Sequence, residues 1–389
     1  MMPMEIASGI YDVGATDWSV RDFHGYKTER GASYNSYLIV DEKICLVDTV
    51  KACYAEELLE KIRRVADPAK IDYVVVNHVE PDHAGALPEV LKAAPNAKFV
   101  ITMQGKNEAL RHYGDGFDFM VVREGDKLSF GSRELTFVPM PMLHWPDNMV
   151  TYCPQDGILF SNDAFGQHYA SSKRFDDEVD EYVLFYEAKK YFANILWPYA
   201  RLIGGALKKA SAFDIKMIAP AHGVIWRSKI AQILEKYAAW GTGVNGKSVV
   251  IAYDTMWGGT EALARAMVEG AAAAGVKVQL MRMDRTPCST VAAELFEAGG
   301  LLVGSPTLNS GMMPTIGGML VYLKGLQPKS KKAAAFGTCG WAGGAQKDME
   351  AMLTAGGFDL QPGFNCKWRA CVDETEAARQ FAYEFAKNL

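Results

Sequence analysis

The sequence predicts an α/β chain with two domains: a layered mixed α/β domain, followed by a doubly wound parallel sheet. The first observation is length, because 389 residues exceed the usual size of a single domain. The second is a change of rhythm, since strands and helices alternate regularly only in the C-terminal part. We therefore predict two domains, residues 1–246 and residues 247–389.

In the N-terminal domain, short apolar runs predict strands that end in polar turns. Two segments, residues 54–66 and 228–240, have apolar residues at helical spacing and are expected to be helices. The expected strands are residues 36–50, 73–79, 98–103, 135–141, 157–163 and 215–223. Most of them end next to His, Asp or Glu, as in a layered scaffold that presents a functional site on its loops.

The C-terminal domain has the strand–helix alternation of a parallel sheet that is covered by helices on both faces. The expected strands are residues 248–254, 276–283, 300–306 and 332–338. The expected helices are residues 261–274, residues around 292–298, a segment before residue 332, and residues 373–389. The loops after such strands meet at one edge of the sheet.

The segment between the domains contains a misleading motif. Residues 241–248, "GTGVNGKS", match the nucleotide-binding pattern G-x-x-x-x-G-K-[ST]. Such a loop needs a preceding strand and a following helix, because the N-terminus of the helix helps to bind the phosphate. Here a helix precedes the segment and a strand follows it. We therefore interpret it as an interdomain linker and exclude an ATPase.

Composition excludes several other classes of function. A formal net charge of −5 argues against nucleic acid and anionic membranes as partners. No apolar run approaches the ~20 residues of a membrane helix, and the N-terminus lacks the pattern of a secretory signal. The 7 cysteines are scattered without a C-x-x-C pair, which excludes a zinc ribbon or disulfide framework. We therefore expect free thiols and a cytoplasmic protein.

Residues with metal-binding chemistry follow several of the N-terminal strands. The segment "HVEPDH" places two imidazoles and two carboxylates close together, and "LHWPDN", "SNDAFGQH" and "PAHG" add further candidates. The candidate catalytic and metal-binding residues are His78, Glu80, Asp82, His83, His144, Asp163 and His222. Because chance poorly explains such a series at strand ends, we predict that it converges on metal. The mixture of nitrogen and oxygen donors favours iron or manganese over a compact zinc pair.

The turn Thr255–Thr260 joins the first strand of the C-terminal sheet to its first helix. Its hydroxyls, glycines and backbone N–H groups suit a phosphate dianion without any lysine, and no G-x-G-x-x-G pattern indicates a dinucleotide. The turn resembles the flavodoxin phosphate loop, and residues 304–311 and 337–346 fit the same resemblance as the edges that hold the isoalloxazine ring of FMN. The cofactor-binding residues implied are Thr255, Met256, Trp257, Gly258, Gly259, Thr260, Ser305, Pro306, Thr307, Leu308, Asn309, Thr338, Cys339, Gly340, Trp341, Ala342 and Gly343.

Together these motifs resemble the flavodiiron proteins, or A-type flavoproteins, over essentially the whole chain. The resemblance implies a metallo-β-lactamase-like αββα sandwich followed by a flavodoxin-like doubly wound parallel sheet. It implies FMN and two non-haem Fe ions as cofactors. The implied ligands are, for one iron, His78, Glu80 and His144, and, for the other, Asp82, His83 and His222, with Asp163 bridging. In the related fold, the equivalent of Asp48 supports the ligands without binding metal.

The same resemblance implies an oxidoreductase that reduces dioxygen to water, nitric oxide to nitrous oxide, or both. Reduced FMN and a diferrous pair hold two electrons each, which together meet the four-electron demand of dioxygen. The resemblance also implies a head-to-tail homodimer or a dimer of dimers, in which the flavin of one chain faces the metals of another. An external donor, rubredoxin or a similar small carrier, would supply the electrons.

Several alternatives stay open at this point. One is a zinc hydrolase of the metallo-β-lactamase fold with an appended flavodoxin domain, which Glu80 disfavours because most such hydrolases carry histidine there. Another is a flavin electron carrier with a vestigial metal centre. The sequence does not separate the two gases, name the donor, distinguish dimer from tetramer, or decide whether His83 binds iron. It also departs from the family pattern at Gly259, where serine is common, and at Gly344, where an acidic residue is common.

Overall fold

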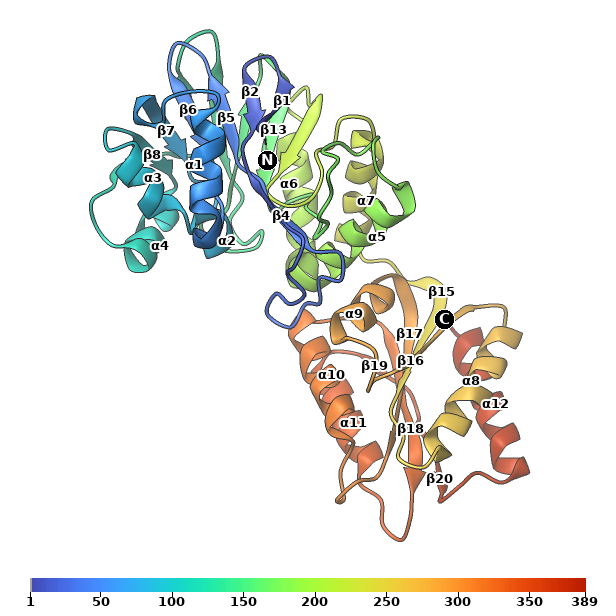
Figure 1. The fold of residues 1–389 in the computed structure, drawn as a ribbon. Helices are drawn as coiled ribbons and strands as arrows, with labels where there is room; N and C mark the ends of the chain where they lie inside the picture. Colours follow the sequence, from blue (N-terminus) through green and yellow to red (C-terminus); the bar gives the residue numbers. More distant parts are fainter. Residues whose placement is uncertain (1) are drawn as a thin grey trace. The chain divides into compact units, whose positions relative to one another are not determined.

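The computed structural model describes residues 2–389, which form two compact units (Figure 1). The first unit holds the chain up to Arg21, Thr28–Tyr191 and Arg201–Ala238, and the second holds Asp22–Lys27, Phe192–Ala200 and Ala239–Leu389. Two short segments of the predicted N-terminal domain therefore belong to the second unit, a feature that no periodicity in the sequence indicates. The domain boundary after residue 246 stays a prediction.

Two mixed sheets form the middle of the first unit. The larger sheet has the strand order β1 (Met4–Ala7), β2 (Ile10–Asp12), β5 (Tyr37–Val40), β6 (Ile44–Val47), β7 (Ile71–Val75), β8 (Lys98–Ile101) and β9 (Asp118–Val121). The smaller sheet has the order β10 (Lys127–Ser129), β11 (Glu134–Pro139), β12 (Met149–Cys153), β13 (Ile158–Asn162) and β14 (Met217–Pro220). A separate pair consists of β3 (Ala15–Asp17) and β4 (Ala32–Tyr34).

The two sheets share an apolar core. Val47 and Val75 of the larger sheet belong to the same buried cluster as Phe137 and Phe160 of the smaller sheet. β-branched and aromatic side chains of this kind suit the pleated surface of a buried sheet face. Their packing fixes the positions of the strand ends, from which the candidate ligands project.

Helices cover the outer sides of the two sheets (Figure 1). On α1, Leu58 and Ile62 are buried against the larger sheet, and Glu56 and Arg63 place charges of favourable sign at the two ends of the helix dipole. The helices on the side of the larger sheet are α1 (Ala55–Arg63), α2 (Pro81–Ala84), α3 (Leu87–Ala93) and α4 (Met103–Tyr113). Those on the other side are α5 (Glu181–Tyr191), α6 (Ile203–Ala210) and α7 (Ile230–Thr242). The predicted αββα sandwich is confirmed.

The second unit is a parallel sheet between two helical layers, which confirms the predicted doubly wound fold (Figure 1). All of β17 is buried, as in a central strand covered on both faces. The strand order is β16 (Lys277–Arg282), β15 (Gly246–Tyr253), β17 (Ala298–Pro306) and β18 (Lys332–Cys339), with β19 (Asp359–Leu360) and β20 (Phe364–Lys367) both beside β18. The helices are α8 (Gly259–Ala273) and α12 (Val372–Lys387) on one face, and α9 (Cys288–Glu297), α10 (Pro314–Leu326) and α11 (Ala345–Ala355) on the other. Because the chain winds away from β15 in both directions, the loops after β15 and β17 diverge and open a crevice.

The segment that resembles a nucleotide-binding loop lies between a helix and a strand, in the order that excludes such a loop. It is shorter than the predicted linker, because α7 extends through Thr242 and β15 begins at Gly246. Throughout residues 2–389, no helix combines the length and apolar character needed to cross a bilayer.

Candidate functional site

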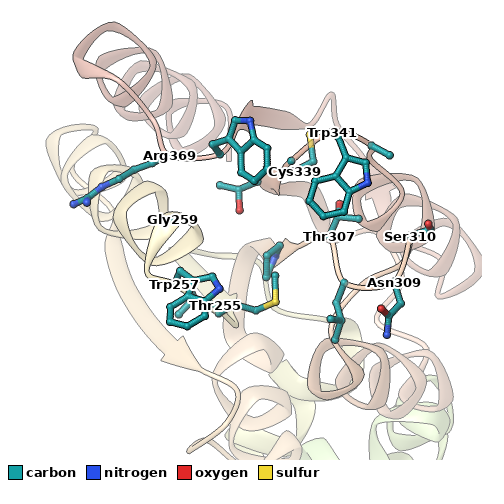
Figure 2. A pocket seen from close by; sticks show the side chains of 16 residues that line it. Thr255, Trp257, Gly259, Thr307, Asn309, Ser310, Cys339, Trp341 and Arg369 are labelled. Carbon is teal, nitrogen blue, oxygen red and sulfur yellow. The ribbon is translucent and has the colours of Figure 1, made fainter.

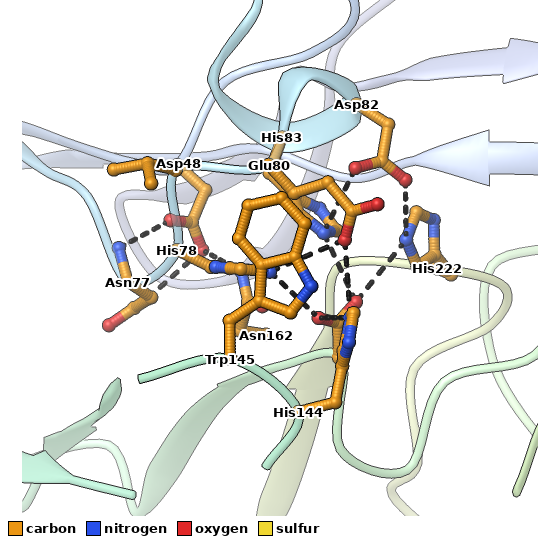
Figure 3. Close-up of polar contacts among 12 residues, drawn as sticks. Asp48, Asn77, His78, Glu80, Asp82, His83, His144, Trp145, Asn162 and His222 are labelled. Atoms are coloured by element: carbon orange, nitrogen blue, oxygen red, sulfur yellow. Dashed lines mark hydrogen bonds and ion pairs between the residues drawn. The ribbon is translucent and has the colours of Figure 1, made fainter. Parts of the chain in front are cut away.

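The candidate ligands in the first unit converge because each follows a strand or lies beside one. His78 comes after β7, Asp163 directly after β13, and His222 after β14. Asp82 and His83 lie on the short helix α2. The first unit therefore brings residues that are far apart in the sequence to one place (Figure 3).

Asp163 stands between two groups of ligands, and its Oδ2 atom faces the first group. Oδ2 lies 3.7 Å from His78 Nε2 and 3.3 Å from His144 Nε2. Glu80 closes this group, because its Oε2 atom lies 3.4 Å from His78 Nε2 and 3.1 Å from His144 Nε2 (Figure 3). Two imidazole nitrogens and two carboxylate oxygens thus surround one point.

The Oδ1 atom of Asp163 faces the second group. It lies 3.1 Å from His83 Nε2 and 3.5 Å from His222 Nε2. Asp82 completes this group, with one carboxylate oxygen 3.3 Å from His83 Nε2 and the other 3.3 Å from His222 Nε2. The carboxylate of Asp163 is therefore shared between the two groups, as a bridging ligand would be.

The spacing and hydrogen bonding of these atoms fit metal ions. Bonds of about 2.0–2.2 Å to one ion, at angles of about 90–110°, place neighbouring donor atoms about 3.0–3.5 Å apart. The cluster has nearly this spacing, and six of its seven residues form two sets of potential ligands in which the ligand atoms lie within 4.8 Å of one another. The sets are His78, Glu80, His83 and Asp163, and Asp82, His83 and His222. Moreover, His78 Nε2, Asp82 Oδ1 and Asp163 Oδ2 are buried without a hydrogen-bond partner. Buried polar atoms rarely stay unpaired unless a ligand engages them.

His83 differs from the other histidines of the cluster. It belongs to both sets of potential ligands, and both of its ring nitrogens are buried without a hydrogen-bond partner. Since the second nitrogen of a metal-binding histidine is usually fixed by a hydrogen bond, the ring of His83 lacks the support that the rings of His78 and His222 have. Its role as a ligand stays a prediction.

Charges within the cluster shift the pKa values of its members in opposite directions. Burial lowers the pKa of His222, but its contacts with Asp163 and Asp82 outweigh burial and raise the pKa to about 10. Burial likewise opposes charge on His144, but contacts with Asp163 and Glu80 raise its pKa to about 9. Burial disfavours the ionised form of Asp163, yet the neighbouring imidazoles hold its pKa well below the usual range. The carboxylates therefore stay ionised, and the imidazoles must release protons when a metal binds.

Two hydrogen bonds orient the imidazoles. His78 Nδ1 lies 2.9 Å from Asp147 Oδ2, and His222 Nδ1 lies 2.7 Å from the carbonyl oxygen of Ser33. Because an ionised carboxylate and a carbonyl only accept, Nδ1 donates in both cases and Nε2 faces the cluster. Sequence reasoning missed Asp147 and Ser33. Asp147 could have been found, since it lies in the same "LHWPDN" segment as His144.

Asp48 connects the strand ends that carry the ligands. Its carboxylate accepts hydrogen bonds from the backbone N–H of Asn77 at 2.7 Å, from Asn77 Nδ2 at 3.0 Å and from Asn162 Nδ2 at 3.2 Å. Asn77 and Asn162 directly precede His78 and Asp163. Asp48 thus fixes the backbone next to two ligands without itself belonging to the sets of potential ligands.

Two more side chains lie close behind the cluster. The Tyr191 hydroxyl donates a hydrogen bond of 2.8 Å to Asp163 Oδ1. The ring of His168 lies 5.2 Å from that of His222, and burial together with the charge on His222 holds the pKa of His168 well below its usual range. His168 is therefore a neutral neighbour of the cluster, outside the sets of potential ligands.

The second unit contains a cavity of 630 Å³ at the C-terminal ends of its strands (Figure 2), a size typical of cofactor sites. The predicted residues that line it are Thr255, Met256, Trp257, Gly259, Pro306, Thr307, Leu308, Asn309, Thr338, Cys339, Gly340, Trp341 and Ala342. Sequence reasoning missed Ser310, Trp368 and Arg369, which also line it. Ser310 lies inside a loop that was identified, whereas nothing in the local pattern marks Trp368 and Arg369.

Gly258, Thr260, Ser305 and Gly343 were also predicted to bind the cofactor but do not line the cavity. Two of them stabilise its walls. Thr260 is buried with its Oγ1 atom 3.1 Å from Thr338 Oγ1, and Ser305 Oγ accepts a hydrogen bond of 2.9 Å from the backbone N–H of Met313. Direct contacts of these four residues with a cofactor stay a prediction.

Both departures from the family pattern have a steric reason. A Cβ atom on Gly344 would lie 1.9 Å from the Ser310 carbonyl oxygen. The loop of Ser310 and the loop of Gly344 can therefore meet only if residue 344 is glycine. A Cβ atom on Gly259 would lie 3.0 Å from the Trp368 carbonyl oxygen. Glycine at these positions therefore allows neighbouring segments to approach closely.

The cavity fits a flavin mononucleotide. The first turn of α8 leaves backbone N–H groups without helical acceptors, and these suit a phosphate. Trp257 and Trp341 are 96% and 89% exposed, which is inconsistent with core packing and leaves their rings available to a planar ligand. The walls thus offer backbone hydrogen-bond donors for a phosphate at the start of α8 and aromatic side chains for a planar ring (Figure 2).

Two family models match successive parts of the chain. The model described as ODP family beta lactamase matches residues 32–223, and the flavodoxin model matches residues 251–381. The first segment contains all the candidate ligands, and the second contains all the residues that line the cavity.

Similar proteins cover the whole chain. A nitric oxide reductase of Moorella thermoacetica is 46% identical over 100% of this chain and 99% of its own length. The anaerobic nitric oxide reductase flavorubredoxin of Klebsiella pneumoniae is 40% identical over 100% of this chain and 82% of its own length. Among solved structures, the flavodiiron protein of Giardia intestinalis has a TM-score of 0.98 at 38% identity, covering 100% of this chain and 96% of that one. The rubredoxin oxygen:oxidoreductase of Desulfovibrio gigas has a TM-score of 0.97 at 38% identity, covering 100% and 98%.

Proposed function

The chain belongs to the flavodiiron proteins, and from this premise we propose that it reduces dioxygen to water, nitric oxide to nitrous oxide, or both. The observation that carries the proposal is the carboxylate of Asp163, whose two oxygens face two separate groups of nitrogen and oxygen donors. Relatives named for each reaction support an oxidoreductase, and FMN and a non-haem diiron pair are its cofactors.

The residues that would hold the irons are those of the two groups. His78, Glu80 and His144 would bind the first ion, and Asp82, His83 and His222 the second. Asp163 would bridge them. When bound, the diiron pair supplies a redox-active centre that binds the gas, and FMN supplies the electrons.

The protein itself orients and tunes this centre. Asp147 and the Ser33 carbonyl hold two imidazoles with Nε2 facing the cluster, so little reorganisation is needed when metal binds. The Tyr191 hydroxyl holds Asp163 by one oxygen, which would keep the bridging carboxylate in place. Glu80 replaces the neutral imidazole of a zinc hydrolase by an anion, and extra negative charge stabilises the higher oxidation state of iron.

In the second unit, the residues that would hold FMN are those of the cavity. The phosphate would sit at the start of α8, near Thr255 and Gly259, and the ring would lie near Trp341. The phosphate-binding turn is fixed to the sheet, because the backbone N–H of Asp254 donates to the carbonyl oxygen of Gly304 in β17 at 3.0 Å, and Asp254 Oδ1 accepts from the backbone N–H of Thr255 at 2.7 Å. This rigidity reduces the entropy lost when the cofactor binds.

The assembly, electron donor and location are part of the same proposal. We expect a head-to-tail homodimer or a dimer of dimers, in which the flavin of one chain serves the metals of another, with electrons from rubredoxin or a similar carrier. All 7 cysteines are free thiols, which supports a reducing, cytoplasmic environment. Catalytic activity in a monomer, measured by size-exclusion chromatography coupled to an activity assay, would contradict the dimer.

Metal analysis and single-turnover kinetics test the function. We expect two irons and one FMN for each chain, and oxidation of the fully reduced protein when either gas is added anaerobically, with the relative rates defining the preference. A protein that contains two zinc ions and that neither gas oxidises would favour the zinc hydrolase instead. A protein that binds FMN but no metal would favour the electron carrier.

A further inference from the structure

We propose that Arg369 binds the phosphate of FMN and supplies the positive charge that the phosphate-binding turn lacks. The turn Thr255–Thr260 contains hydroxyls and glycines but no cation. Among the described residues that line the cavity, Arg369 is the one with a permanent positive charge. This inference rests on FMN as the cofactor of the proposed function and goes beyond it by assigning a new contact.

The path of the chain brings Arg369 to the phosphate end of the cavity. Trp368 and Arg369 follow β20, and the carbonyl oxygen of Trp368 lies against Gly259 at the first residue of α8. A Cβ atom at residue 259 would lie 3.0 Å from that oxygen, so glycine leaves the room that the segment occupies. The serine hydroxyl common in the family is absent here, and Arg369 directly follows the residue whose carbonyl oxygen lies against Gly259.

The backbone of this segment is held in an uncommon conformation. Trp368 has a φ of 60°, a left-handed conformation that bulky residues rarely adopt without compensation. Its backbone N–H donates a hydrogen bond of 2.7 Å to the Cys339 carbonyl oxygen, and its ring packs on Gly340, where a Cβ atom would lie 2.9 Å from the ring. These contacts compensate the strain and direct the next residue, Arg369, along the start of α8.

The guanidinium of Arg369 is available for a ligand. Within residues 2–389 it has no hydrogen-bond or ion-pair partner, whereas Arg265 of α8 is paired with Glu261 at 2.8 Å and Arg282 of β16 with Asp284 at 2.9 Å. In Figure 2 its side chain extends from the cavity wall away from the centre, beside Gly259. Because Arg369 is exposed, its side chain can rotate toward a phosphate at the helix N-terminus, where its charge and the helix dipole favour the same anion.

Comparing FMN with riboflavin tests the assignment, because the two flavins differ only in the phosphate. FMN is removed from the full-length protein, and each flavin is titrated back while its fluorescence is followed. We expect Arg369→Gln to raise the Kd of FMN about 10-fold, the range of a charge-assisted hydrogen bond, and to leave the Kd of riboflavin unchanged. Arg369→Lys should recover part of the FMN affinity, and the FMN affinity of Arg369→Gln should depend less on salt concentration.

Lys367→Gln is the matched control. It removes a positive charge from the same segment, but Lys367 is exposed and does not line the cavity, so the Kd values of both flavins should stay as in the parent protein. If Arg369→Gln weakens FMN and riboflavin equally, the residue acts through the shape of its segment and the proposal is wrong. It is equally wrong if neither Kd changes. If the parent protein binds neither flavin, the proposed function fails instead.

Discussion

The metal cluster of the first unit and the cavity of the second unit are built by opposite means. The cluster consists of side chains that are almost completely buried, with His78 at 0% and Asp163 at 1% exposure. The cavity consists largely of loop backbone and of exposed rings such as Trp341. Ions of high charge need charged ligands in fixed positions, whereas a large planar cofactor needs room, backbone donors and aromatic surface.

This difference predicts which kind of substitution damages each site. In the cluster, the chemistry of a side chain is essential, because neighbouring charges determine the protonation state of each carboxylate and imidazole. In the cavity, the space around the backbone is essential, because loops such as those of Ser310 and Gly344 meet without room for a side chain. Substitutions in one unit should therefore leave the cofactor of the other in place, which the following predictions test.

The largest effect is expected for Asp163→Ala. This substitution removes the carboxylate that both groups share and leaves the surrounding imidazoles without their main counter-charge. We expect most of the iron to be lost and gas reduction to fall by about 1,000-fold or more, as for loss of a group that acts with others as a unit. Iron content and FMN content are measured together, and FMN should stay at the parent level.

Asp177→Asn is the control for this variant, because Asp177 is a surface carboxylate paired with Arg227 at 3.0 Å. It should keep both cofactors and full activity. Retention of stoichiometric iron by Asp163→Ala would show that the two groups bind metal without a shared ligand. The interpretation of Asp163 as the bridge would then be abandoned.

Gly344→Ala should produce the complementary defect. Its Cβ atom would lie 1.9 Å from the Ser310 carbonyl oxygen, so the loops at the ring end of the cavity must separate. We expect FMN affinity to fall about 100-fold, as for a loss of several simultaneous contacts, with iron content unchanged. Flavin titration and metal analysis measure the two effects.

Gly318→Ala on α10 provides the control for Gly344→Ala, because Gly318 does not line the cavity. No atom lies within 4 Å of the position that its Cβ would occupy, so FMN should bind as in the parent protein. Equal losses in the two variants would mean that a general effect on the second unit, rather than the close contact with Ser310, determines FMN affinity.

Asp147→Asn should have a smaller effect, because it changes the support of a ligand and not the ligand. The amide keeps the shape but accepts a weaker hydrogen bond from His78 Nδ1, which lies 2.9 Å from the carboxylate in the parent. Loss of such a supporting interaction typically costs 10–100-fold in metal affinity. Competition with a chelator measures the iron affinity, and a shift in the absorption spectrum of the iron centre would report the changed ligand.

Glu108 offers a further comparison with Asp147. Burial and the nearby carboxylate of Asp147 raise the pKa of Glu108 to about 7. A negative charge on Glu108 therefore disfavours the negative charge on Asp147, the residue that orients His78. Glu108→Gln removes this opposing charge while keeping the size of the side chain. It should therefore retain iron at least as tightly as the parent, in contrast to Asp147→Asn.

The sequence was sufficient to name the candidate ligands but not the residues that support them. His78, Asp163 and His222 could be found because each follows an apolar strand and has metal-binding chemistry, and both signals are local. Ser33 could not, since its carbonyl acts on His222 from a distant part of the chain. Whether these seven residues bind iron stays a prediction that metal analysis of the variants will test.

The same reasoning explains what could be predicted in the second unit. The doubly wound sheet followed from the regular alternation of strands and helices, and the loops at its edge followed from their glycines. Trp368 and Arg369 were missed because their place at the cavity depends on the contact between Trp368 and Gly259, which pairs two loops that are remote in sequence. The steric need for glycine at residue 344 was hidden for the same reason.

The effect of pH separates the two sites most directly. Before metal binds, His144 and His222 hold protons with pKa values of about 9 and about 10, and each proton must leave when iron binds. Below these pKa values the apparent affinity for Fe²⁺ should therefore rise with pH, by about tenfold per unit for each proton released. FMN affinity should stay nearly constant between pH 7 and pH 9, because the phosphate is already ionised and Arg369 keeps its charge. Anaerobic titrations of the metal-free protein at several pH values, in weakly buffered solution that reveals proton release, measure both quantities. Equal pH dependence for Fe²⁺ and FMN would mean that a global change in folding, and not the imidazoles of the cluster, controls binding.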